Sequence, residues 1–156
     1  LRREYSIGGI KLRIIIDADA CPKGVKLVCE ELSKKYNLEL IMVVDTAHEL
    51  RGNFKVIQVE KGDDSVDLEI MKISKKDDIV VTQDYGLATI ILEKTYSVIH
   101  PNGFIYNKFN IDSLMFSRHM SAKIRASGGR TKGPKKRKSN NDVEFKETLL
   151  SLLENL

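Results

Sequence analysis

Continuous apolar runs alternate along the chain with segments in which apolar residues recur every three or four positions. The runs are short and rich in β-branched residues, which is typical of strands buried on both faces of a sheet. They predict strands at 13–16, 38–44, 54–59 and 78–82, with shorter strands at 97–99 and 104–106. The segments with helical spacing predict helices at 22–37, 62–73, 86–94, 110–127 and 143–153. The helix at 110–127 would have Ile111, Leu114, Met115, Met120 and Ile124 as its apolar side.

This alternation of strands and helices predicts an α/β protein. Right-handed crossovers between parallel strands place helices on both faces, so we expect a three-layer α/β/α sandwich with a mainly parallel sheet. The 156 residues fit one domain. We divide the chain into an N-terminal extension (1–11), the α/β domain (12–127), a flexible basic loop (128–141) and a C-terminal helix that docks on the domain (142–156).

The composition, with 42% apolar and 31% charged residues, is ordinary for a soluble protein. The apolar runs are far shorter than the roughly 20 residues of a membrane-spanning helix, and the amino end lacks an apolar signal-peptide core. We therefore expect a cytoplasmic protein without a membrane partner. Cys21 and Cys29 are eight residues apart on one predicted helix. That spacing of about 12 Å is too long for a disulfide, so we expect reduced thiols.

Positive charge is concentrated in one part of the chain. Between Arg118 and Lys138 there are nine Lys and Arg residues and no Asp or Glu, so the net charge of +4 leaves the remainder at −5. Such a segment attracts a phosphate backbone without reading its sequence, although a solvated loop that balances an acidic body is an equal alternative. The expected nucleic-acid-binding residues are Arg118, Lys123, Arg125, Arg130 and Lys132.

Carboxylates follow three of the predicted strands. Asp17 and Asp19 end the first, Asp84 follows the fourth, and Asp64 and Asp67 open the helix after the third. Because ligands bind at the carboxyl ends of parallel strands, these side chains should meet at one edge of the sheet. Hard oxygen ligands in that number suit Mg²⁺ or Mn²⁺. The competing interpretation is that the same acids cap the starts of helices.

Four separated motifs, "IDADACP", "GDDSVDLEI", "VVTQDYGLA" and "IRASGGRTKGP", occur in an order that resembles the bacterial YaiI/YqxD family of uncharacterised proteins. The resemblance implies a PIN-like α/β/α fold, related to NYN-like domains, in a superfamily rich in Mg²⁺-dependent ribonucleases. Carried over by motif, it implies an acidic set, here Asp17, Asp19, Asp67 and Asp84, with Asp64 as an additional candidate. Further pocket candidates at the same strand ends are Thr82, Gln83, Thr46 and His48.

The leading hypothesis is a Mg²⁺- or Mn²⁺-dependent nuclease that hydrolyses RNA or single-stranded nucleic acid with a metal-activated water. Asp17, Asp67 and Asp84 would be its catalytic residues. One alternative is a non-catalytic protein that binds RNA or the ribosome. Another is a phosphatase of the haloacid-dehalogenase type, with Asp17 as nucleophile and Asp19 as acid and base, although no convincing lysine follows a later strand. Nucleic acid, RNA in the first place, is the expected partner, and a homodimer is left open.

Overall fold

A computed structural model describes residues 6–7, 10–45, 50–131, 137–138 and 140–155. Its centre is a five-stranded sheet in the order β5-β4-β3-β6-β7, with all neighbours parallel. The strands are β3 (Arg13–Asp17), β4 (Glu39–Val44), β5 (Lys55–Gln58), β6 (Asp78–Val81) and β7 (Ser97–Ile99). Two further short strands, β1 (Ser6–Ile7) and β2 (Ile10–Lys11), pair antiparallel apart from this sheet, within the segment expected to be an extension.

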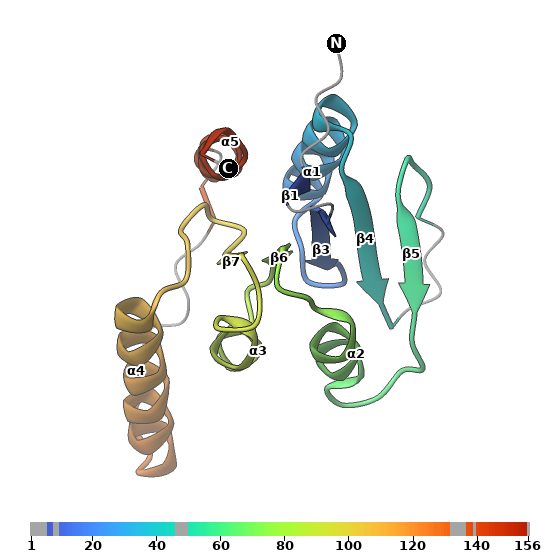
Figure 1. Cartoon of the computed structure of the whole chain (residues 1–156). Helices are drawn as coiled ribbons and strands as arrows, with labels where there is room; N and C mark the ends of the chain where they lie inside the picture. The colour runs from blue at the N-terminus through green and yellow to red at the C-terminus, as the bar shows by residue number, and fades with distance from the viewer. Residues whose placement is uncertain (1–5, 8–9, 46–49, 132–136, 139, 156) are drawn as a thin grey trace.

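Helices cover both faces of the sheet, as expected for a three-layer α/β/α sandwich. On one face lie α1 (Lys23–Tyr36) and α5 (Asn141–Glu154), and on the other lie α2 (Ser65–Ile73) and α3 (Tyr85–Ile91) (Figure 1). The central strand shows why the sequence specifies this arrangement. Ile14 and Ile16 pack toward α1 and α5, whereas Ile15 between them packs toward α2 and α3. Successive side chains of a strand point to opposite faces of the sheet. An unbroken apolar run is therefore buried on both faces, under a layer of helices on each side.

The remaining helix, α4 (Lys108–Ala126), departs from the expectation. Its start is fixed by a capping box between Asn107 and Asn110, and it extends away from the body (Figure 1). Only Ile111 among its residues is buried, and Met115, Met120 and Ile124 are exposed. The expected apolar side is therefore covered only in the first turns of the helix. Helical periodicity reports that one side of a helix is apolar, but not whether another element covers it.

The strand expected at 104–106 is also absent. This segment makes one isolated antiparallel bridge, between Ile99 and Ile105, and has no other regular structure. The His100 N–H donates to the Phe104 carbonyl and the Tyr106 N–H donates to the Val98 carbonyl, and Gly103, with a φ of 102°, lies in the turn between these two segments. No helix in the described part of the chain has both the length and the apolar character that crossing a membrane requires.

Candidate functional site

The register of the sheet brings the ends of β3 and β6 together. Ile16 lies opposite Val81, so Asp17 at the end of one strand lies beside Thr82 after the other. The buried Thr82 hydroxyl donates to Asp17 Oδ2 at 2.9 Å and accepts from the Asp84 backbone N–H at 3.0 Å. Behind it, the Tyr106 hydroxyl donates to the Thr82 carbonyl at 3.0 Å. Thr82 therefore orients both Asp17 and the chain that leads into Asp84.

Asp84 has two neighbours of different kinds. Its Oδ1 accepts from the Leu87 N–H at 3.1 Å, so it caps α3, as the capping interpretation expects. Its carboxyl group also lies close enough to that of Asp67, in the first turn of α2, to raise the pKa of Asp67. Asp84 thus caps α3 and also belongs to the acidic cluster.

Electrostatic strain is concentrated at these acids. Burial, the hydrogen bond with Asp84 and the charges of Asp84, Asp17 and Asp64 raise the pKa of Asp67 to about 7. Burial also raises the pKa of Asp17, and the charge of Asp84 raises it further, against the lowering effect of the Thr82 hydrogen bond. Three elements, β3, α2 and the segment after β6, therefore deliver mutually repelling carboxyl groups to one edge of the sheet.

The other two expected ligands lie at the periphery of this cluster. Asp19 is exposed, and its Oδ2 accepts from the Asp45 N–H at 2.7 Å, which ties the end of β3 to the end of β4. A hydrogen bond between the two side chains raises the pKa of Asp45. Asp64 is exposed with a φ of 61°, and its charge is the weakest of the influences on Asp67. Asp45 was not among the residues predicted for the site.

The donor set fits a hard divalent cation in its chemistry. Within the described residues, no three His, Cys, Asp or Glu side chains already form a group that could hold a metal ion. Mg²⁺, however, is commonly held by one or two carboxylates, with water and substrate phosphate as its other ligands. Asp17, Asp67 and Asp84 offer carboxyl oxygens whose mutual repulsion a dication would relieve. These three residues are the candidate ligands for such an ion, one or two of them at a time, with Asp19 and Asp64 further out.

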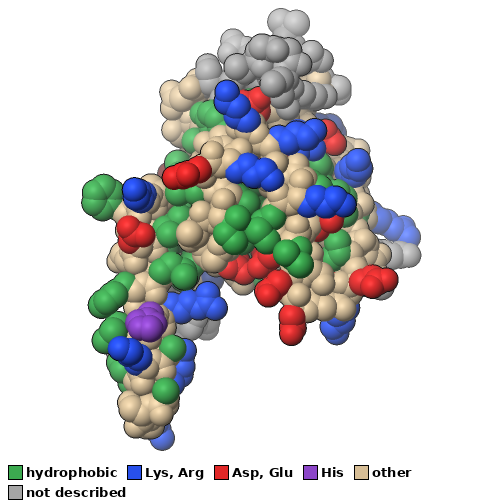
Figure 2. All heavy atoms as spheres, turned by 60° about the horizontal axis from the view of Figure 1, so that its bottom comes forward, with side chains coloured by type: hydrophobic (Ala, Val, Ile, Leu, Met, Phe, Trp, Pro, Cys, Tyr) green, Lys and Arg blue, Asp and Glu red, His purple; other side chains and the backbone are tan. Residues whose placement is uncertain are grey.

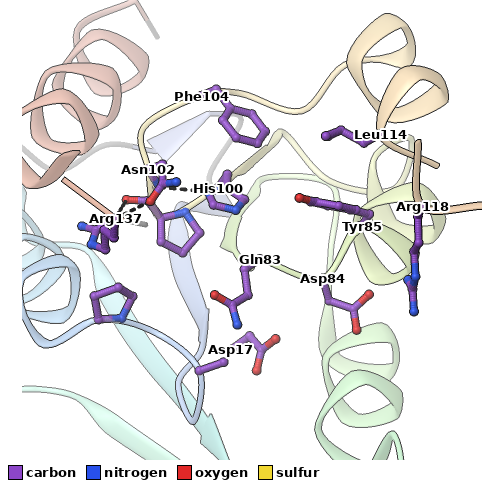
Figure 3. A pocket seen from close by; sticks show the side chains of 13 residues that line it. Asp17, Gln83, Asp84, Tyr85, His100, Asn102, Phe104, Leu114, Arg118 and Arg137 are labelled. Carbon is purple, nitrogen blue, oxygen red and sulfur yellow. Dashed lines mark hydrogen bonds between the residues drawn. The ribbon is translucent and has the colours of Figure 1, made fainter. Parts of the chain in front are cut away.

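A pocket of about 750 Å³ opens beside Asp17 and Asp84 (Figure 3). Gln83 lies with the two acids on one side, and aromatic rings lie on the opposite side. The rings of His100 and Phe104 are stacked, with centroids 4.4 Å apart and planes 15° apart. The rest of the pocket lining comes from the turns after β3 and β7, from α3 and α4, and from the segment before α5. The residues that complete the lining are Ala20, Pro22, Tyr85, Pro101, Asn102, Leu114, Arg118 and Arg137.

The described cations that were expected to bind nucleic acid lie in two different places, one at the pocket and the others away from it. Arg118 lines the pocket from α4. Lys123, Arg125 and Arg130 are exposed at or beyond the far end of that helix and do not line it. Lys132, Thr46 and His48 lie outside the described residues.

Sequence reasoning missed Arg137, which lines the pocket at the end opposite Arg118 (Figure 3). Its guanidinium donates to the Pro101 carbonyl at 3.0 Å and to Asn102 Oδ1 at 2.6 Å, and it pairs with Asp142 of α5. In the sequence it is one of several consecutive cations, and nothing local separates it from Lys135, Lys136 or Lys138. Arg137 is distinguished from these lysines only by its contacts in the folded protein, which include the one with α5.

Comparison with known proteins gives a consistent family. The model of the family described as "Uncharacterized BCR, YaiI/YqxD family" matches residues 15–155. A "UPF0178 protein" of Ruminiclostridium cellulolyticum is 46% identical over 140 residues, covering 89% of this chain and 90% of the relative. One from Clostridium tetani is 46% identical over 143 residues, covering 91% and 97%. No solved structure gives a significant match. By its motifs, its family model and these relatives, the chain belongs to the bacterial YaiI/YqxD family.

Proposed function

We propose that the chain is a metal-dependent nuclease that cleaves RNA or other single-stranded nucleic acid, with Mg²⁺ or Mn²⁺ bound at Asp17, Asp67 and Asp84. The observation that carries the proposal is the cluster of carboxyl groups of Asp17, Asp67 and Asp84 at one edge of the sheet, where burial and the neighbouring carboxyl groups raise the pKa of Asp67 to about 7. A chain gathers carboxylates in this way at a cost in stability, which a bound cation offsets. The adjoining pocket, with Arg118 at its rim, supplies room and positive charge for a phosphate chain.

Each residue has a defined part in this proposal. A bound divalent ion supplies a water of lowered pKa and positive charge beside the phosphodiester. Asp17, Asp67 and Asp84 bind the ion as carboxylates, so Asp67 must release its proton first. Thr82 keeps Asp17 oriented by donating to Oδ2, and Asp84 is held in place by the Leu87 N–H. Arg118 orients the phosphate chain across the acidic edge.

The first test is cleavage of end-labelled single-stranded RNA in the presence of Mn²⁺. Asp17→Asn and Asp84→Asn should each lower the rate by at least about 100-fold, because each removes a group that holds the metal. Asp112→Asn, an equivalent change on exposed α4, is the matched control and should leave the rate unchanged. Equal cleavage by the wild type and both site variants would assign the activity to a contaminant and contradict the proposal.

Metal binding can be checked without activity. A ligand that binds only the folded protein raises its unfolding midpoint. Mn²⁺ should therefore raise the midpoint of the wild type and of Asp112→Asn, and raise that of Asp67→Asn much less. RNA binding without cleavage or metal binding would favour the non-catalytic alternative. Hydrolysis of a phosphomonoester with a trapped aspartyl-phosphate would favour the phosphatase instead.

A further inference from the structure

The pocket has an aromatic wall that the proposed chemistry at the carboxylates does not require. The wall consists of Tyr85, His100 and Phe104, and all three line the pocket. Tyr106 supports it from behind, with its ring centroid 6.2 Å from that of Tyr85 and 5.2 Å from that of Phe104. Tyr106 is fully buried, whereas Phe104 is 36% exposed. The wall is thus fixed on its inner side and accessible on its outer side.

The wall is also held in one arrangement before any ligand binds. His100 stacks on Phe104, and its Nδ1 accepts from the Asn102 N–H at 2.9 Å. Burial and the charge of Arg137 lower the pKa of His100 to about 4, so the ring is neutral at neutral pH. A neutral ring whose Nδ1 accepts a hydrogen bond carries its proton on Nε2. A flat ligand would therefore meet rigid apolar ring faces, which reduces the ordering cost of binding.

An arginine lies at each end of the pocket, Arg118 and the Arg137 that pairs with Asp142, and the floor between them is acidic. Figure 3 shows Arg137 at one end and Arg118 at the other, with Asp17 and Asp84 between them and opposite the rings. A phosphate chain laid along this line would have a cation on each side of the carboxylates. The volume of about 750 Å³ is within the usual range for pockets that enclose a small ligand, roughly 300–1,000 Å³.

We infer that the pocket binds one unpaired base of a single-stranded nucleic acid, stacked on the Tyr85, His100 and Phe104 wall, while Arg118 and Arg137 hold the flanking phosphates. The inference rests on the proposed function, because it places that base beside the phosphodiester to be cut. Aromatic side chains bind bases whose faces are uncovered, and a base inside a duplex has both faces covered by its neighbours. The pocket therefore selects single strands, or ends and loops, over paired strands.

The test measures affinity by fluorescence anisotropy in EDTA, where metal-dependent cleavage does not occur. The probe is a labelled adenosine hexanucleotide, compared with the same backbone carrying abasic sites and with a duplex of the same strand. The wild type should bind the hexanucleotide about 10-fold more tightly than the abasic backbone, the scale of one base stacked on an aromatic side chain. Equal affinity for the two would overturn the inference, and this comparison needs no variant.

Two variants assign the effect to the wall. Phe104→Leu and Tyr85→Leu should each weaken binding of the hexanucleotide by about 5-fold to 10-fold, and leave the abasic backbone unaffected. Phe109→Leu and Tyr96→Leu are the matched controls, because both rings are exposed outside the pocket. Unfolding midpoints establish that each variant is folded. Equal losses for both probes, or losses in the controls, would contradict a base site.

The outcome is separable from that of the nuclease test. Base-dependent binding without metal-dependent cleavage would retain the base site and refute the nuclease. Cleavage that proceeds equally well on base-paired and single strands, with unchanged rates in Phe104→Leu and Tyr85→Leu, would retain the nuclease and refute the base site.

Discussion

Asp67 differs from an ordinary surface acid in its pKa. It lies in the first turn of α2, where a carboxylate is favoured by the helix dipole. That local advantage is outweighed by burial and by three neighbouring carboxyl groups, which together raise its pKa to about 7. The sequence places an acid at this position, and its raised pKa arises from burial and from neighbouring carboxyl groups that the fold brings to it.

We predict that Asp84→Asn lowers the pKa of Asp67 in the metal-free protein. The change removes the charge that opposes ionisation of Asp67, while the side chain keeps its size and its capacity to hydrogen-bond. The measurement is a carbon-detected NMR titration of the Asp carboxyl groups between pH 3 and pH 9. Asp112→Asn should leave the Asp67 midpoint where it is in the wild type. An unchanged Asp67 midpoint in Asp84→Asn would show that burial alone causes the shift.

At the scale of elements, the site depends on a turn and a helix that are far apart in sequence. The turn after β7 carries His100, Asn102 and Phe104 into the pocket, and Gly103 at its tip touches the backbone of α5. Thr148 of α5 donates to the Gly103 carbonyl at 2.6 Å. The same helix presents Asp142 to Arg137. The docking of α5 therefore shapes one whole side of the pocket.

We predict that Gly103→Ala is more destabilising than Gly128→Ala. Both glycines have positive φ, 102° and 87°, so each substitution strains the backbone by about 1 kcal/mol. A Cβ at Gly103 would also lie 2.8 Å from backbone atoms of Glu144 and Phe145, whereas one at Gly128 would meet nothing within 4 Å. The extra clash should bring the loss at Gly103 to about 2–4 kcal/mol in urea unfolding. Similar losses of stability at the two sites would mean that α5 can shift away from the new Cβ atom without destabilising the protein.

At the scale of the whole molecule, Lys and Arg side chains lie on the α/β body as well as on α4, while acidic side chains are more localised (Figure 2). Acidic side chains gather on the α/β body near its junction with α4, and α4 carries Lys and Arg side chains (Figure 2). The body also contains two groups whose titration affects folding in opposite directions. The pKa of Asp67 is raised to about 7 and that of His100 is lowered to about 4. Their effects on stability should oppose each other in weakly acidic solution.

We predict that the free energy of unfolding in EDTA depends only weakly on pH. Two variants separate the contribution of Asp67 from that of His100. The stability associated with protonated Asp67 is present below its unfolded pKa of 3.8 and is lost as the pH rises to about 7. The stability associated with neutral His100 is present above its unfolded pKa of 6.5 and is lost as the pH falls to about 4.

Asp67→Asn should therefore gain stability as the pH rises from 4 to 6.5, and His100→Gln should lose it. A whole proton corresponds to a slope of about 1.4 kcal/mol per pH unit, and partial solvation makes the Asp67 slope smaller. Unfolding midpoints in urea at several pH values provide the measurement. Parallel pH profiles for the wild type and both variants would contradict the assignment of these two groups.

The sequence by itself determined the elements and the edge at which the acids meet. Apolar runs and helical spacing are local properties, so they predicted the five parallel strands, the helices between them and the three-layer arrangement. Because parallel strands end at a common edge, the order of strands and acids along the chain was enough to place Asp17 and Asp84 together. Their catalytic role stays a prediction.

Only the tertiary structure decided which side chains touch. Asp19 holds the end of β4 rather than lying within the cluster, Arg137 is selected from a run of equivalent cations, and most of the apolar side of α4 remains exposed. Each of these outcomes depends on distances between elements that are far apart in the sequence. Such distances are set by the packing of loops and helices on one another, and no local pattern of residues encodes them.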